Sequence, residues 1–348
     1  MKQLMAIATL ATLLLSSCTD SDKWKRIDVS KIPVQLNVLR FEQDFNRFDT
    51  SHIVESEATL RAKYRSFYDD YVRGIIGLGK PMSKLDTAGH DYHIDMLGFF
   101  ANKADRDLYD SVQQQYSSLH DIQAGLTDAL RHYQYYFPTA PKVTTVYTFI
   151  SEFANGTITY NDTILGIGLD MYLGEKYRYY ESVGFPKFMQ RKLTRAYIVP
   201  NSMEVLYNLN YDKAAYNAQL PLIEAMVNEG KKCYFIECMM PDTPDSIVMG
   251  YTTTQADWCR KSEKQIWQYF NDRDLLYKVN YMEQKRYTTD GPTTAGMPAE
   301  APPKVGSWLG WQIVRRFMKN SGGKVSLADL LTKYSAKQIF TMANYKPK

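Results

Sequence analysis

Hydrophobic positions along the chain recur mostly with the period of an α-helix, about 3.6 residues per turn. In the segment 55–76, one face carries five hydrophobic side chains: Leu60, Tyr64, Phe67, Tyr68 and Tyr71. The same periodicity predicts helices near 93–118, 120–137, 184–208, 212–232, 254–272 and 306–320. A last helix is expected over 326–334, with Ser326 as its N-cap. The chain is therefore expected to be mainly helical.

The hydrophobic period changes between residues 142 and 169. This stretch is rich in β-branched and aromatic residues, and the pairs Asn155-Gly156 and Asn161-Asp162 are typical of turns. We expect strands near 143–150, 157–160 and 164–169, and an extended segment at the start of 34–45. The pattern thus predicts an α+β fold, mostly helical, with a small antiparallel β-sheet.

No internal repeat and no interdomain linker interrupts the pattern after residue 33. The segment 288–304 is rich in Pro, Gly and Thr and is expected to be a long loop. We therefore interpret residues 34–348 as a single domain. The polar residues 18–33 are interpreted as a tether in front of it.

The first seventeen residues have the pattern of a secretory signal peptide. Lys2 precedes an apolar run over 4–15 that is too short to span a bilayer. The run ends in Leu15-Ser16-Ser17-Cys18, which resembles the lipobox of bacterial lipoproteins, whose cysteine is acylated and becomes the new N-terminus. Acyl chains on Cys18 would anchor the protein, because each buried methylene adds roughly 0.8 kcal/mol. Thr19 is not the aspartate of inner-membrane retention, so we expect an outer-membrane lipoprotein facing the periplasm or the cell surface.

Composition narrows the classes of function. Of the 348 residues, 45% are hydrophobic and 23% are charged, and the net charge is +4. Lys and Arg are scattered without a basic run, which argues against nucleic acid as the main partner. The 27 tyrosines are interpreted first as residues of half-buried positions, and alternatively as a platform for a ligand.

Three cysteines follow Cys18: Cys233, Cys238 and Cys259. Their odd number in an exported chain leaves at least one thiol outside any intramolecular disulfide. No histidine accompanies them, so a zinc knuckle is not expected. We predict that all three behave as small buried apolar residues.

A carboxylate interrupts the apolar face of the segment LIEAMVNEGKKCYFI, residues 222–236. On a helix, Glu229 shares a face with four apolar side chains: Leu222, Ala225, Met226 and Cys233. Glu224 points the other way, toward solvent. An ionised carboxylate among apolar groups is unfavourable unless it is paired, hydrogen-bonded or bound to a metal. Glu229 is therefore the first candidate functional residue.

Familiar motifs give no support to nucleotide binding or to α/β-hydrolase chemistry. The sequence contains no GxxxxGK[ST] loop, no GxGxxG after a strand and no GxSxG. All five histidines lie between residues 52 and 132. His90 and His93 have a spacing that suits a metal, with Asp91 or Asp95 as a third ligand. We interpret this stretch instead as a solvated helix start.

Several segments together resemble the gliding-motility lipoprotein family GldB. They are VLRFEQDF (38–45), TILGIGLDMYLG (163–174), LIEAMVNEGKKCYFI (222–236) and PPKVGSWLGWQIVRRFM (302–318), in addition to the lipobox. The resemblance runs through most of the chain. It implies an envelope lipoprotein linked to gliding machinery, with protein partners in the envelope.

The GldB family is in turn similar to predicted zinc peptidases of the gluzincin type, which implies a zincin-like fold. Gluzincins place two histidines and a general-base glutamate in HExxH on one helix, and a ligand glutamate on a second. By this resemblance Glu229 stands where the ligand glutamate would be, and Glu204 is the nearest counterpart of a base or ligand. No histidine follows His132, and Pro200 is expected to interrupt the helix beside Glu204. We therefore expect a pseudo-zincin domain with no metal and no other cofactor.

An arginine is the expected partner of Glu229, with Arg191, Arg195 and Arg315 as candidates. The leading functional hypothesis is a membrane-anchored, non-catalytic scaffold or binding component of the GldB type. One alternative is an active envelope hydrolase, a peptidase or glycan hydrolase, that uses Glu229 and Glu204 as its carboxylates. Another is a tyrosine-rich ligand-binding lipoprotein with four side chains on one groove: Tyr172, Tyr177, Tyr179 and Tyr180.

Overall fold

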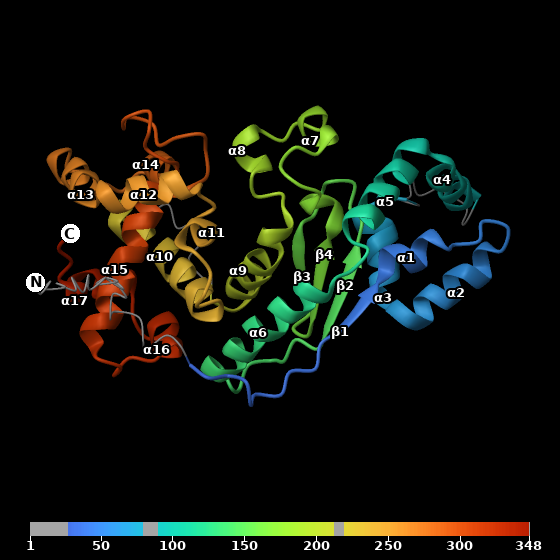
Figure 1. The fold of residues 1–348 in the computed structure, drawn as a ribbon, viewed down its shortest axis with the longest axis horizontal. Helices are drawn as coiled ribbons and strands as arrows, with labels where there is room; N and C mark the ends of the chain where they lie inside the picture. The colour runs from blue at the N-terminus through green and yellow to red at the C-terminus, as the bar shows by residue number, and fades with distance from the viewer. Residues whose placement is uncertain (1–26, 79–89, 212–218, 348) are drawn as a thin grey trace, which may run out of the picture.

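A computed structural model describes residues 27–78, 90–211 and 219–347 of the chain. A central sheet separates two groups of helices (Figure 1). The signal segment, Cys18 and the first part of the tether lie outside the described residues. Within the described ranges, no helix has both the length and the apolar character needed to cross a membrane.

The sheet has four strands in the order β1-β2-β4-β3, with β1 at Asn37–Arg40, β2 at Thr145–Phe149, β3 at Thr157–Tyr160 and β4 at Ile164–Gly168. The pairs β1/β2 and β2/β4 are parallel, and only β3/β4 is antiparallel. The expectation of an antiparallel sheet was therefore wrong. The reason is that β3 does not pair with β2 but lies at the edge beyond β4, so β4 returns beside β2 in the same direction. The α+β class is confirmed.

The N-terminal helices are shorter than the periodicity predicts. They are α1 (Phe41–Asn46), α2 (Ile53–Tyr64), α3 (Ser66–Asp70), a π-helical turn (Tyr71–Ile75), α4 (His90–Ala101) and α5 (Lys103–Gln115). The helix expected over 55–76 breaks at Arg65, whose φ of 54° is left-handed. The helix expected over 93–118 breaks at Asn102, whose side chain caps α5 at Ala104.

The longest helices of the second group are α6 (His120–Tyr136), α9 (Ile198–Tyr211), α10 (Leu222–Met239) and α15 (Val305–Ser321). Shorter elements are η3 (Leu169–Tyr172), α7 (Arg178–Ser182), α8 (Lys187–Gln190), η4 (Arg195–Tyr197), α11 (Asp245–Met249), α12 (Thr253–Lys261), α13 (Glu263–Asp272), α14 (Tyr281–Thr288), α16 (Leu327–Thr332) and α17 (Ala336–Ala343). Where one helix is expected over 184–208, the structure has α8, η4 and α9. Where one is expected over 254–272, it has α12 and α13. Ser326 accepts a hydrogen bond from the Asp329 amide at 3.0 Å, which confirms the predicted N-cap.

Two hydrophobic clusters meet at the sheet. On one face, Val146 of β2 and Leu165 of β4 pack with α6 and α9 in a cluster that continues through α10 and α15. On the other face, Tyr147 and Phe149 of β2 join the aromatic side chains of α1 to α3. All five residues of the predicted face in 55–76 are buried in this second cluster. Alternation along a strand sends successive side chains to opposite faces, so β2 connects the two clusters.

The backbones of α10 and α15 cross in direct contact at glycines. A Cβ on Gly230 would lie 2.6 Å from the Trp311 amide nitrogen, and a Cβ on Gly310 would collide with the Met226 carbonyl. Such an approach is open only to residues without a side chain. The crossing fixes the rotation of α10 and therefore the direction in which its polar residues point.

Candidate functional site

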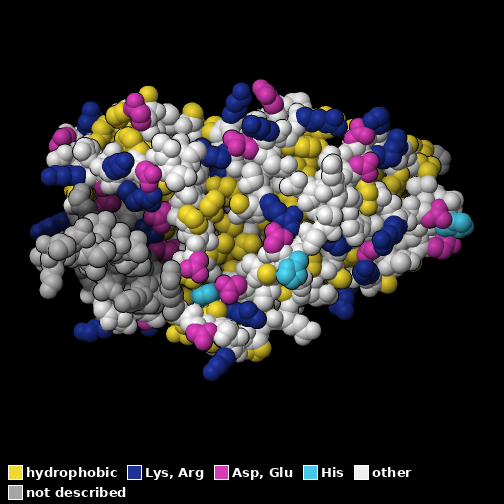
Figure 2. All heavy atoms as spheres, in the orientation of Figure 1, with side chains coloured by type: hydrophobic (Ala, Val, Ile, Leu, Met, Phe, Trp, Pro, Cys, Tyr) yellow, Lys and Arg dark blue, Asp and Glu magenta, His cyan; other side chains and the backbone are white. Residues whose placement is uncertain are grey.

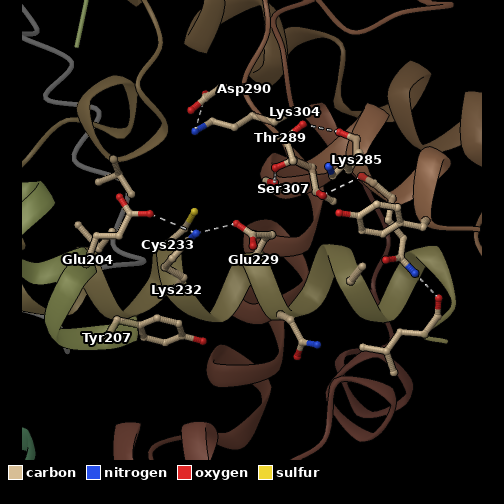
Figure 3. Close-up of a pocket in the computed structure, with 18 of the residues that line it drawn as sticks. Glu204, Tyr207, Glu229, Lys232, Cys233, Lys285, Thr289, Asp290, Lys304 and Ser307 are labelled. Carbon is tan, nitrogen blue, oxygen red and sulfur yellow. Dashed lines mark hydrogen bonds and ion pairs between the residues drawn. The ribbon is translucent and has the colours of Figure 1, made fainter. Parts of the chain in front are cut away.

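A cavity of about 260 Å³ opens between α9, α10, α14 and the start of α15 (Figure 3). Helix α9 contributes Glu204 and Tyr207, and α10 contributes Glu229, Lys232 and Cys233. The remaining charged side chains come from three other segments: Lys192, Lys285, Asp290 and Lys304. We call this cavity the lysine pocket. It is the site that contains both carboxylates singled out in the sequence.

The ammonium group of Lys232 lies between the two carboxylates. Its Nζ is 3.2 Å from Glu204 Oε1 and 3.0 Å from Glu229 Oε2, and Figure 3 shows the side chain rising from α10 between them. Glu229 and Lys232 are three residues apart and share a helix face, whereas Glu204 arrives from α9. The side chains remain partly open to the cavity, with 40% of Glu204, 28% of Glu229 and 20% of Lys232 exposed. Glu229 is therefore paired with a lysine.

The expected arginine partner of Glu229 was wrong for all three candidates. Arg191 donates to the Gly250 carbonyl at 2.7 Å, and Arg195 binds Asp121 at 2.7 Å. Arg315 pairs with Glu237, two turns further along α10, at 2.8 Å. Glu237 is more deeply buried than Glu229, with 9% of its side chain exposed compared with 28%. Its carboxylate therefore needs the pairing with Arg315 more. Glu224, which is predicted to point toward solvent, is half-buried.

Charges in the pocket hold one another in the ionised state. Burial alone would raise the pKa of Glu204, but the ammonium groups of Lys232, Lys304 and Lys192 outweigh it and lower the pKa. Burial alone would lower the pKa of Lys232, but Glu204 and Glu229 raise it well above its ordinary value. At physiological pH the two carboxylates and the ammonium group of Lys232 together carry one net negative charge.

A second charged cluster lies at the same pocket, with the signs reversed. Asp290 contacts Lys192 and also Lys304, whose Nζ is 3.1 Å from Asp290 Oδ1. Burial opposes ionisation of Asp290, but the two ammonium groups hold its pKa far below the ordinary value. The positive excess of this cluster balances the negative excess around Lys232.

Replacing Lys232 by methionine is expected to lower the free energy of unfolding at neutral pH by about 1–2 kcal/mol, between the values for exposed and buried ion pairs. The lysine holds the pKa of Glu204 below 4.5, so its stabilisation is present above that value and is lost as the pH falls through the lowered pKa. Urea unfolding at neutral pH and at about pH 3 should show the deficit shrinking in acid. Lys187→Met, on the exposed side of α8, is the control and should change little. A deficit of equal size at both pH values would contradict the expectation.

Cys233 lies in the wall of the pocket but is not an activated nucleophile. Burial raises the pKa of its thiol to about 12. Among the described residues, Cys233, Cys238 and Cys259 are all buried, as predicted, and none is part of a disulfide. We expect that iodoacetamide at about pH 8 leaves Cys233 unmodified in the folded protein and alkylates it in urea. Peptide mass spectrometry checks this, and rapid alkylation without denaturant would contradict it.

The donor atoms around the two glutamates do not fit a zinc ion. At the HExxH spacing around Glu204 stand Met203 and Tyr207, both buried and neither able to supply an imidazole. The Lys232 ammonium is within 3.2 Å of both carboxylates and would repel a dication there. In the part of the chain that the structure describes, no cluster of three or more His, Cys, Asp or Glu side chains is placed to hold a metal. His93 and Asp95 are exposed, and the side chains of His90 and Asp91 lie outside the described residues.

Pro200 does not interrupt the helix that carries Glu204, contrary to expectation. Helix α9 runs unbroken over Ile198–Tyr211, with Pro200 as its third residue. Amides in the first turn have no partner inside the helix, so a proline there removes no helical hydrogen bond. Glu204 and Tyr207 therefore lie on one continuous helix beside α10.

The expected tyrosine groove is not formed. Tyr172 and Tyr180 are fully buried, and the Tyr180 hydroxyl donates to the Asp170 carbonyl at 2.8 Å. Tyr177 and Tyr179 are half-buried. These side chains cover the end of the sheet near η3, so the ligand platform is not supported.

Sequence reasoning missed five charged groups of the pocket: Lys192, Lys232, Lys285, Asp290 and Lys304. Lys232 carried a readable signal, because its position three residues after Glu229 places it on the same helix face. Asp290 and Lys304 belong to the long segment between α14 and α15. This segment has no helical or strand periodicity from which the direction of its side chains could be predicted. Figure 2 shows that Lys and Arg are interspersed with Asp and Glu over the face it presents, so charge patterning alone does not reveal the pocket.

Comparison with known proteins gives a match over nearly the whole chain. A family model described as "Gliding motility protein GldB" matches residues 22–347. No curated protein and no solved structure matches the chain.

Proposed function

Because the chain belongs to the gliding motility protein GldB family, we propose that it is a membrane-anchored envelope lipoprotein acting as a non-catalytic binding component. Cys18 is the proposed site of acylation, after removal of residues 1–17 as a signal peptide. Residues 18–33 form the proposed tether, and residues 34–348 one domain, supported by the sheet that joins both hydrophobic clusters. The outer membrane is the proposed location.

The observation that carries the non-catalytic proposal is the position of Lys232 between Glu204 and Glu229. A hydrolytic pair of carboxylates needs one protonated acid, whose pKa is raised, beside one ionised base. In the lysine pocket the pKa of Glu204 is instead lowered. This favours a binding role over proton transfer. The zincin-like ancestry stays a prediction.

Incubation with envelope polymers tests the absence of catalysis. The purified full-length protein, with and without added zinc, would be mixed with peptidoglycan sacculi and with a peptide library. We expect no soluble fragments by mass spectrometry beyond those released by Glu204→Gln or Glu229→Gln. Fragment release that Glu204→Gln abolishes would overturn the non-catalytic proposal, as would stoichiometric bound zinc that is lost in the same variant.

A hydrolase remains the second candidate because one observation favours it. Both carboxylates line one open pocket and contact the same nitrogen atom, so their separation falls within the roughly 10 Å range of paired catalytic carboxylates. The fragment-release assay separates the two proposals, since only the hydrolase requires turnover.

Membrane attachment and partners are tested in cells of the native host. Labelling with a palmitate analogue is expected to mark the wild-type protein and not Cys18→Ser, which should leave the membrane fraction. Chemical crosslinking is expected to capture envelope proteins of the gliding machinery with the anchored protein. Labelling of Cys18→Ser at the wild-type level would refute the anchor, and capture of soluble cytoplasmic proteins alone would refute the envelope role.

A further inference from the structure

A second cavity, of about 270 Å³, lies on the other side of the molecule's sheet. It shares no lining residue with the lysine pocket. Its walls are largely aromatic and come from α1, the π-helical turn, α4 and α5: Phe45, Tyr71, Phe99, Phe100 and Tyr109. Phe45 holds this wall together, with ring centroids 5.2 Å from both Tyr71 and Phe100. We call this cavity the aromatic cavity.

The topology brings carboxylates to one edge of the sheet beside this cavity. Strands β1, β2 and β4 are parallel, so their carboxyl ends meet at the same edge. Glu42, Glu152 and Asp170 each follow one of these ends within three residues. In open sheets with parallel strands, ligands bind in the crevice outside the carboxyl ends.

A buried carboxylate fixes the turn that carries Glu152. Asp170 is fully buried and accepts hydrogen bonds from the Ser151 amide at 2.9 Å and the Phe153 amide at 2.6 Å. Glu152 and Phe153 both have left-handed backbones, with φ of 54° and 66°. The turn thereby places the Glu152 side chain in the lining of the aromatic cavity.

The charged side chains that line the cavity carry more negative than positive charge. Glu42 is satisfied by Arg40 and by the Thr148 hydroxyl at 2.6 Å. Arg106 donates to the carbonyls of Phe100 and Ala101. Asp105 is half-buried and Glu152 is exposed. Neither forms an ion pair with a described residue, and partial desolvation raises the pKa of both, with the charges of Asp105 and Asp170 adding to the shift at Glu152. Arg106 also lines the cavity, but its guanidinium donates to the two backbone carbonyls and pairs with neither carboxylate, so Asp105 and Glu152 keep one negative charge in excess beside the aromatic wall.

We propose that the aromatic cavity binds a small organic cation carrying an ammonium group. The faces of aromatic rings attract ammonium groups, and desolvation strengthens this attraction. Asp105 and Glu152 supply the complementary charge, while the ring walls disfavour a hydrated metal ion. The volume suits a compact molecule and excludes a folded partner. This inference does not rest on the function proposed for the lysine pocket.

Titration with choline and its neutral isostere 3,3-dimethylbutan-1-ol tests the proposal, with tetramethylammonium and cadaverine as further cations. Calorimetry on the purified full-length protein is expected to show binding of at least one of these cations. If choline binds, the neutral isostere is expected to bind at least tenfold more weakly than choline. Glu152→Gln and Asp105→Asn should each weaken cation binding about tenfold. Tyr109→Leu should weaken it while leaving the fold intact by circular dichroism.

Matched controls separate this site from the rest of the molecule. Glu181→Gln, an exposed glutamate on α7, removes the same charge and should bind like wild type. Lys232→Met alters the lysine pocket and should also leave cation binding unchanged. The proposal is overturned if no cation of the panel binds, if the isostere binds as tightly as choline, or if Glu181→Gln weakens binding as much as Glu152→Gln.

Discussion

Replacing Gly310 by alanine is expected to destabilise the protein by about 3 kcal/mol or more. The new Cβ would collide with the Met226 carbonyl, which belongs to the backbone of α10 and has no rotamer to change. Relief therefore requires the two helices to move apart, and this separation would open the cluster that contains Trp308 and Trp311. Urea unfolding monitored by tryptophan fluorescence measures the loss.

Gly98→Ala is the matched control for Gly310→Ala. Gly98 lies in α4, and no atom stands within 4 Å of the position of a new Cβ. Alanine there is expected to be neutral or to stabilise by up to about 1 kcal/mol, because glycine is the poorer helix former. Equal stability of the two variants would show that the α10–α15 crossing is not held by backbone contact.

Replacing Arg315 by methionine is expected to cost about 3 kcal/mol, the second large effect. The guanidinium binds Glu237 at 2.8 Å and Asp245 at 2.7 Å, and it stacks on Trp311 with 3.8 Å to the ring centroid. Methionine preserves much of the packing but leaves Glu237 charged and enclosed, where the Trp311 indole N–H still donates to it at 2.8 Å. Denaturant unfolding at neutral pH gives the loss.

Two further variants show whether the loss of stability in Arg315→Met comes from the unpaired charge of Glu237. Arg315→Met combined with Glu237→Gln should recover at least half of the stability, because the amide is neutral and still accepts from Trp311. Arg260→Ala removes an arginine that also approaches Asp245, at 3.6 Å, but is 48% exposed, and should cost less than about 1 kcal/mol. Similar losses for Arg315→Met and Arg260→Ala would contradict the role of burial.

The arginine network and the lysine pocket together explain why α10 carries two inward carboxylates. Glu229 and Glu237 are eight residues apart and point from the same helix toward different neighbours. Glu237 meets Arg315 of α15, whereas Glu229 meets Lys232 of its own helix, which also binds Glu204 of α9. The first pairing lies within the core, and the second lies at an open cavity. Only the second is therefore placed to meet a ligand.

Elements with a strong period were predictable, and their ends were not. The burial of Leu60, Tyr64 and Tyr71 follows from spacing alone, although the helix that carries them breaks at Arg65. The break depends on the left-handed backbone of one residue, which the spacing of hydrophobic side chains does not predict. The sheet was located correctly between residues 143 and 169, but its parallel pairing was not predicted, because β3 lies beyond β4 and β1, from residues 37–40, adds a second parallel pair beside β2.

The sequence by itself determined the helical character, the apolar faces, the buried cysteines and the presence of a carboxylate on the inner face of α10. These properties depend on side-chain spacing within one continuous segment, which fixes the face each residue occupies. The tertiary structure alone decided that Glu229 binds Lys232 together with Glu204 and that Arg315 belongs to Glu237. Partners across helices depend on how the helices are rotated and how closely they cross. Here the backbone contact at Gly230 and Gly310 sets both, and spacing along one segment carries no information about it.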